Sequence, residues 1–206
     1  MHAFTDRAFK NVAKNRWKIH KFGGSSLADA ACFRRVAGIV TALPEERLGV
    51  VVSAMGGMTD ALLNLAALAE RDDASFETEL HAIGERYAGT AKELLEGDAL
   101  VPVLDAWSAD AEDVRDVLKA VALVKSAPQR NRDVVAGFGE IWSARLLAAL
   151  LAQEVPEQGG TWVDARQVVT VHETELGPAV QWEKSQAGFD KTVPGDFAGI
   201  AVITGF

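Results

Sequence analysis

The sequence predicts an α/β fold with a mainly parallel sheet and a helical insertion, and three observations support this. Two short runs with the composition of strands, residues 17–22 and 48–52, each lead into a glycine turn and then a helical pattern. The second run is a continuous β-branched series, which is typical of a strand buried on both faces of a parallel sheet. Residues 75–127 are acidic and helically periodic, which predicts two long helices covering one side of the sheet.

The other elements follow in chain order. Residues 26–29 (SLAD) have the form of a capping box, so we expect a helix that begins at Ser26 and ends before Pro44. The later elements are predicted as a helix over 129–153, short strands over 161–165 and 167–171, a weak helix over 180–191 and a strongly apolar strand over 198–205.

The apolar closing strand bears on domain organisation. No helix follows it, whereas buried strands of an α/β sheet need covering helices. We therefore expect residues 17–206 to be the N-terminal part of a longer domain, truncated at its C-terminus, behind an N-terminal extension over 1–16. The alternative is a complete protein whose last strand lies centrally in the sheet.

Composition and charge argue against several classes of function. A net charge of −8 argues against nonspecific nucleic-acid binding, and we interpret the basic residues before the first strand as a solvated extension rather than a recognition arm. No apolar run approaches the roughly 20 residues of a membrane span, so no membrane partner is expected. A single cysteine, Cys32, indicates a reducing, cytoplasmic setting. No zinc spacing, nucleophile elbow or dinucleotide fingerprint appears.

Residues 21–26 (KFGGSS) are the first candidate for chemistry, because they place a cation, two glycines and two hydroxyls at a strand-to-helix junction. Backbone N–H groups at such a junction come close to a phosphate. Lys21 precedes the glycines, whereas the P-loop lysine follows them. Together with Gly23 and Gly24, Lys21 is a candidate to surround triphosphate oxygens. The alternative is a strand-end lysine in water beside a tight turn.

A second glycine turn follows the second strand. Ser53 ends that strand, and Thr59 stands near the start of the next helix, where hydroxyls and free N–H groups bind anionic ligands. The alternative is that Thr59 merely caps its own helix. Two glycine turns that each follow a strand should face the same edge of a parallel sheet, where α/β ligands usually bind.

Glu140 is the third candidate, because it shares a helical row with apolar residues 4, 7 and 11 positions later. Arg145 points elsewhere on the helix and is a poor partner. A carboxylate on an apolar row is costly unless it meets a cation or donors. It either forms a salt bridge to another element or binds the ammonium group of a small amino acid. Asp164 and Arg166 follow a strand and are interpreted as a loop pair.

Together these motifs resemble the N-terminal half of aspartokinase, in the amino-acid kinase superfamily. The matching segments are residues 21–26 (KFGGSS), 53–60 (SAMGGMTD) and 139–143 (GEIWS), continued by 162–166 (WVDAR) and 202–206 (VITGF). The resemblance covers about residues 17–206. The third segment is most similar to enzymes that fuse aspartokinase to homoserine dehydrogenase.

The resemblance implies a three-layer α/β/α sandwich, the N-terminal lobe of the amino-acid kinase fold. It also implies ATP-dependent phosphorylation of the L-aspartate side-chain carboxylate to 4-phospho-L-aspartate with Mg²⁺, the first step toward lysine, threonine and methionine. The parent enzyme is expected to be a homo-oligomer. Lys21 would be catalytic, and the implied ATP-phosphate contacts are Lys21, Gly23, Gly24 and Ser25. The implied aspartate contacts are Ser53, Thr59 and Glu140, and no protein metal ligand is implied.

One departure from the family pattern is large. The glycine- and arginine-containing segment that follows the Thr-Gly-Phe turn in the family, and the nucleotide-binding lobe after it, are not in this sequence. We therefore expect the chain alone to be inactive. The rival interpretations are another amino-acid kinase, acting on glutamate, acetylglutamate, carbamate or uridylate, and a non-catalytic binding module of the same fold.

Overall fold

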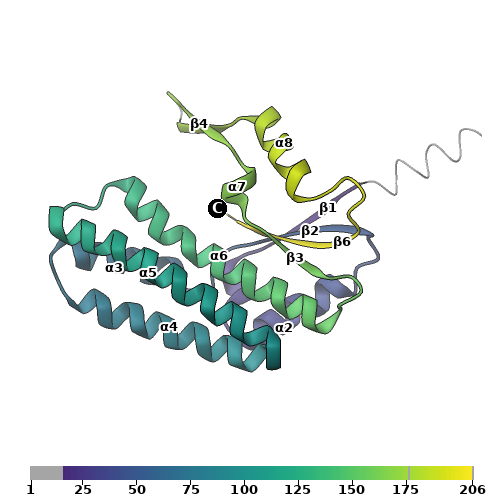
Figure 1. The fold of residues 1–206 in the computed structure, drawn as a ribbon, viewed down its shortest axis with the longest axis horizontal. Coiled ribbons are helices and arrows are strands. Elements are labelled where there is room, and N and C mark those ends of the chain that lie inside the picture. Colours follow the sequence, from purple (N-terminus) through teal and green to yellow (C-terminus); the bar gives the residue numbers. More distant parts are fainter. Residues whose placement is uncertain (1–15, 176, 206) are drawn as a thin grey trace, which may run out of the picture.

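A four-stranded parallel sheet in the order β1-β2-β6-β3 forms the centre of the computed structural model, which describes residues 16–175 and 177–205 (Figure 1). The strands are β1 Lys18–Phe22, β2 Arg47–Val52, β3 Gly160–Val163 and β6 Gly199–Thr204. The two continuous apolar runs, β2 and β6, are paired at the centre of the sheet and are almost wholly buried. The predicted extension over 1–16 lies outside the described residues apart from Arg16.

The last strand, β6, lies between β2 and β3. Helix α6, Gln129–Glu154, packs on one face of β2, β6 and β3. The burial of β6 therefore does not depend on a helix that follows it, and the expectation that it needs one was wrong for this strand.

The long helices lie on one side of the sheet in two layers (Figure 1). Helix α3, Met58–Glu70, packs on α6, and the predicted long helices α4, Ser75–Leu94, and α5, Leu100–Val124, pack on α3 from outside. The short 3-10 helix η2, Gly97–Ala99, connects α4 to α5. The long helices therefore cover the sheet through α3 and α6 rather than by direct contact.

Helix α2, Ala30–Thr41, begins later than the sequence pattern predicts. Its N-cap is Asp29, whose side chain accepts a hydrogen bond from the Cys32 N–H at 2.9 Å. Ser26 instead lies inside the 3-10 helix η1, Gly24–Leu27. The predicted capping box was therefore wrong, because the chain makes one 3-10 turn after the glycines before the helix starts.

Helix α6 forms the core of the molecule. It is long and apolar enough to span a membrane by composition alone, with a mean hydropathy of 1.5 over its most apolar 18 residues. However, 78% of that window is buried by the rest of the structure. Its apolar character is explained by packing, since it lies between the sheet and helices α3 and α5.

The other face of the sheet carries a smaller layer. It consists of α7 Ala165–Val168, the antiparallel hairpin of β4 Val171–Thr174 and β5 Gly177–Val180, and α8 Trp182–Thr192. A second apolar cluster joins Val163, Val168, Val193 and Ala201, with Trp17 and Phe189 packed against it. The sheet thus lies between two layers, as predicted. The strand predicted over 167–171 was wrong, because α7 occupies its first half.

Candidate active site at the carboxyl edge of the sheet

The two glycine turns lie against each other at the carboxyl ends of β1 and β2. The N–H of Ser53 donates to the Phe22 carbonyl at 3.0 Å, which ties the end of one strand to the start of the other turn. A Cβ atom on Gly24 would lie only 2.9 Å from the Ala54 carbonyl oxygen. The turns can meet this closely because Gly24 has no side chain, so the glycine there is a packing requirement.

The first turn exposes three of the four residues predicted to contact phosphate, whereas Gly24 is half-buried. Gly23 is the N-cap of η1, and its carbonyl accepts from the Ser26 N–H at 2.9 Å. Lys21, Gly23 and Ser25 are exposed. The structure therefore leaves this cation, this glycine and this hydroxyl accessible to a ligand.

The register shows which face of the sheet Lys21 occupies. Lys21 pairs with Val51, which pairs with Ile203. Side chains alternate along a strand, so Lys21 shares the face of these residues, opposite to Phe22, which packs on the main core. Lys21 is at the carboxyl edge, but it approaches that edge from the smaller-layer side.

The second turn starts α3 without a side-chain cap. Gly57 is the N-cap at φ 76°, a left-handed conformation that favours glycine. Thr59 is therefore not the cap of its own helix, and that alternative was wrong. Ser53 and Thr59 are both half-buried at the start of the turn and of the helix.

Helix α6 brings Glu140 to the same edge. The side chain is 8% exposed, and its Oε2 atom is buried without a hydrogen-bond partner among the described residues. Burial raises the pKa of the Glu140 carboxyl above its ordinary value of 4.5, although backbone hydrogen bonds from Glu140 itself and Ala54 partly offset this. No salt bridge of Glu140 is found within the described part of the chain, so the structure does not support the salt-bridge alternative.

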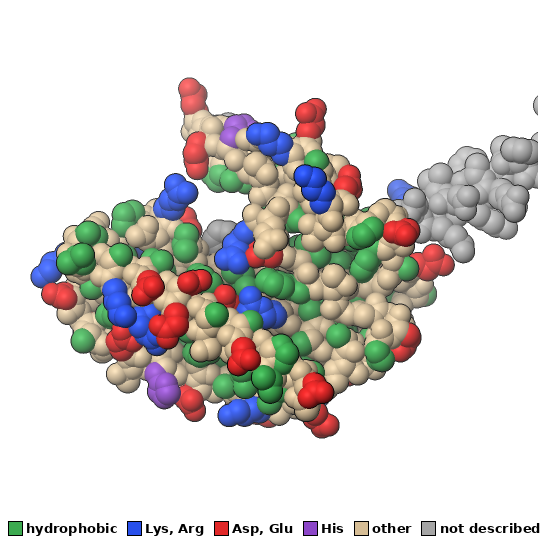
Figure 2. Space-filling model, in the orientation of Figure 1, with side chains coloured by type: hydrophobic (Ala, Val, Ile, Leu, Met, Phe, Trp, Pro, Cys, Tyr) green, Lys and Arg blue, Asp and Glu red, His purple; other side chains and the backbone are tan. Residues whose placement is uncertain are grey.

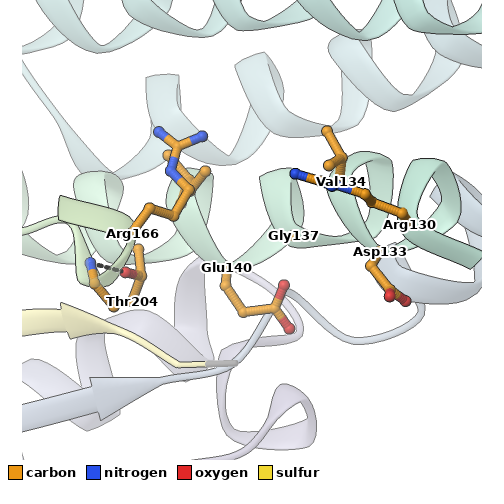
Figure 3. A pocket seen from close by; sticks show the side chains of 9 residues that line it. Arg130, Asp133, Val134, Gly137, Glu140, Arg166 and Thr204 are labelled. Atoms are coloured by element: carbon orange, nitrogen blue, oxygen red, sulfur yellow. Dashed lines mark hydrogen bonds between the residues drawn. The ribbon is translucent and has the colours of Figure 1, made fainter. Parts of the chain in front are cut away.

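A pocket of about 320 Å³ opens beside Glu140. Its lining residues are Arg130, Asp133, Val134, Gly137, Glu140, Ile141, Ala165, Arg166 and Thr204. In Figure 3, Glu140 reaches from α6 toward the loop after β2, and Arg130 and Arg166 lie on either side of it. Figure 2 shows a hollow between the block that carries α8 and the helical layers. The pocket therefore combines a buried carboxylate with guanidinium groups.

The position of Arg166 is set by its contacts with Asp164 and Phe138 and by the hydrogen bond that holds the start of its helix, α7. Its Nε and Nη2 atoms donate to the Asp164 carboxylate at 3.0 and 2.7 Å, as the loop-pair interpretation predicted. Arg166 also lies over the Phe138 ring. Thr204 Oγ1 accepts from the Ala165 N–H at 2.7 Å, which holds the start of α7 (Figure 3). Arg166 therefore forms a loop pair and lines the pocket at the same time.

The structure brings Ser53, Thr59 and Glu140 to one edge of the sheet together with the first turn. Of the residues predicted for the site, Glu140 lines the 320 Å³ pocket, whereas Lys21, Ser53 and Thr59 and the residues of the first turn do not. Sequence reasoning missed Arg130, which carries no motif of its own. Thr204 lies in the VITGF segment, but the sequence did not predict it as a site residue.

Gly139 fixes the distance between α6 and the second turn, which gives a testable prediction. A Cβ atom there would lie 2.8 Å from Ala54 Cβ and 3.3 Å from Met58 Cγ. We expect Gly139→Ala to lower the free energy of unfolding by about 1–3 kcal/mol through overpacking. Gly137→Ala is the matched control, because no atom lies within 4 Å of its added Cβ. It should stabilise α6 by about 0.5–1 kcal/mol. Urea denaturation that ranked the two variants in the opposite order would contradict the packing argument.

The sequence profile of the Amino acid kinase family matches residues 16–194, and the chain belongs to this family. Within it, the resemblance to aspartokinase is confirmed. The chain is 33% identical to bifunctional aspartokinase/homoserine dehydrogenase 1, chloroplastic, of Arabidopsis thaliana, over 98% of this chain and 23% of that protein. It is 38% identical to bifunctional aspartokinase/homoserine dehydrogenase 2 of Escherichia coli K12, over 75% of this chain and 18% of that protein. It therefore spans less than a quarter of either relative.

Solved structures agree on the fold. E. coli aspartokinase III in complex with lysine and aspartate superimposes with a TM-score of 0.73 at 20% identity, covering 90% of this chain and 40% of that one. The same enzyme in complex with aspartate and ADP gives the same values. The described residues thus have the fold of an aspartokinase.

Proposed function

We propose that this chain carries the aspartate-binding part of an aspartate kinase, which forms 4-phospho-L-aspartate from L-aspartate and ATP. The observation that carries the proposal is the Glu140 carboxylate, buried beside the second glycine turn with an oxygen that has no partner among the described residues. A substrate ammonium group would satisfy that oxygen and offset the cost of burial. The aspartokinase relatives support this choice over other family substrates.

In this proposal the chain's residues bind and orient the substrate. Glu140 holds the ammonium group of aspartate, and the hydroxyls of Ser53 and Thr59 donate to its carboxylates. An aspartate side chain is already ionised at neutral pH, because its ordinary pKa is about 3.9. Its oxygen therefore attacks the γ-phosphorus of ATP without a general base, the new O–P bond forms, and ADP leaves with the bridging oxygen.

The first turn supplies the phosphate contacts in this proposal. Lys21, Gly23, Gly24 and Ser25 face the phosphates, and the Lys21 ammonium neutralises charge that develops during transfer. No group of three or more metal-binding side chains is found among the described residues. In this proposal a magnesium ion would be held mainly by substrate phosphates and water, as this ion usually is with nucleotides.

The proposed reaction belongs to the protein at its full encoded length. The bifunctional relatives support a nucleotide-binding part, and also a homoserine dehydrogenase part, beyond the segment matched here. We place the protein in the cytoplasm, expect a homo-oligomer, and expect residues 1–206 alone to turn over little aspartate.

The test is an ADP-release assay of the protein at its full encoded length with a panel of acceptors. We expect turnover that depends on L-aspartate and is absent with glutamate, acetylglutamate, carbamate and uridylate. Turnover with another acceptor would replace aspartate with that substrate. Aspartate binding in calorimetry without any turnover would instead identify a non-catalytic binding module.

A further inference from the structure

Arg86, on α4, donates hydrogen bonds to both glycine-turn segments at once. Its Nη2 atom lies 2.7 Å from the carbonyl oxygen of Gly56 and 3.1 Å from that of Ala28. Gly56 is in the second turn, and Ala28 directly follows η1, which closes the first. One guanidinium group from the outer helical layer therefore bridges the two segments that meet at the candidate site.

Besides the Ser53–Phe22 backbone hydrogen bond, the two segments meet through close approaches of residues with small side chains or none. A Cβ atom on Gly56 would lie 3.2 Å from Ala28 Cβ and 3.3 Å from the Gly24 carbonyl oxygen. Such a contact between glycine and alanine is close but has no preferred direction. Directional hydrogen bonds from a charged donor supply one, and they are stronger than bonds between neutral groups.

The bond to Gly56 also orients the peptide unit at the start of α3. In a trans peptide the carbonyl of one residue and the N–H of the next point in opposite directions. Because Arg86 holds the Gly56 carbonyl, the N–H of Gly57 points away from Arg86. Gly57 is the N-cap of α3 and has no side-chain cap hydrogen bond. Arg86 therefore stabilises an orientation that no capping side chain supports.

We propose that Arg86 is a positioning residue, which holds the two glycine turns at the separation that bound substrates need. The inference rests on the proposed kinase function and deepens it, because it names a residue outside the matched motifs that sets the geometry of the site. It also makes α4 the helix through which a shift of the outer layer reaches both turns.

The test compares Arg86→Met with Arg34→Met in the protein at its full encoded length. Arg34, on α2, donates to the Glu93 carbonyl on α4. The control variant thus also removes a bond from an arginine to a backbone carbonyl next to α4, but one that touches neither turn. We expect Arg86→Met to raise the KM for ATP and for aspartate about tenfold with a smaller change in kcat. Arg34→Met should leave both KM values unchanged, and Arg86→Lys should restore part of the loss.

Amide hydrogen exchange gives a readout that needs no turnover. We expect exchange to accelerate in residues 23–29 and 53–59 of Arg86→Met, but not of Arg34→Met. Unchanged KM values together with unchanged exchange in both turns would overturn the inference, whatever happens to the Tm. Faster exchange in a protein that phosphorylates no acceptor would leave the bridging role of Arg86 intact and reject the proposed function.

Discussion

Replacing Glu140 with glutamine is expected to raise the KM for aspartate about 100-fold while the protein stays folded. The carboxylate is 8% exposed and its Oε2 atom has no partner among the described residues, so a bound ammonium group would be its counter-charge. Removing one partner of a buried charge pair costs about 2–5 kcal/mol, and about 2.7 kcal/mol corresponds to 100-fold. Steady-state kinetics at varied aspartate and saturating ATP measure this effect.

In the same variant, the free energy of unfolding should depend on pH differently from that of wild type. Burial raises the pKa of folded Glu140 above the ordinary 4.5, so the folded state holds its proton to higher pH than the unfolded state. Wild-type stability therefore falls as the pH rises from about 4.5 through the raised pKa, and stays lowered above it. Glutamine does not titrate. The free energy of unfolding of Glu140→Gln relative to wild type should thus increase across that window.

Glu154→Gln is the matched control, because Glu154 lies at the exposed end of the same helix and undergoes the same chemical change. It should leave the KM for aspartate unchanged, and urea denaturation of both variants is followed over the same pH range. If Glu140→Gln behaved like Glu154→Gln in both measurements, Glu140 would not be the ammonium-binding residue.

The second large effect is expected for Lys21→Ala, which should lower kcat by at least about 100-fold, the usual cost of losing one group that stabilises transition-state charge. Lys21 is exposed at the end of β1, so its removal leaves no buried cavity and the Tm should change little. The ADP-release assay at saturating substrates measures the effect.

Lys18→Ala is the control for this experiment. Lys18 lies on the same strand and forms a salt bridge with Glu45 near the surface, and exposed pairs of this kind contribute little to stability. It should leave kcat unchanged. Normal phosphorylation of aspartate by Lys21→Ala would show that the lysine before the glycines is a solvated strand end, and the assignment of the first turn would be wrong.

The two central strands were predictable, because a continuous apolar run indicates a strand that is buried on both faces. The apolar runs 48–52 and 198–205 became β2 and β6, paired at the centre of the sheet. Glu140 was predictable as a site residue because a carboxylate on an apolar helical row is costly without a cation or hydrogen-bond donors. In the structure its Oε2 atom is buried and has no partner among the described residues.

The errors have a common cause, since each concerns a local pattern that several structures can satisfy. The SLAD segment satisfied the rule for a capping box, yet a 3-10 turn placed Asp29, not Ser26, at the cap. Residues 167–171 have strand-like composition, but the start of α7 is held by the Thr204 hydroxyl, which is remote in sequence.

By itself the sequence determined the class of fold, the two glycine turns and the isolated carboxylate, because hydrophobic periodicity and residue chemistry are local properties of the chain. Only the tertiary structure decided that Gly24 touches Ala54, that Lys21 lies on the smaller-layer side of the sheet rather than on the main-core side, and that Arg86 joins both turns. These contacts link residues about 30 or more positions apart, or depend on which side of a strand a residue faces. Packing of whole elements sets such relations, and no local pattern encodes them.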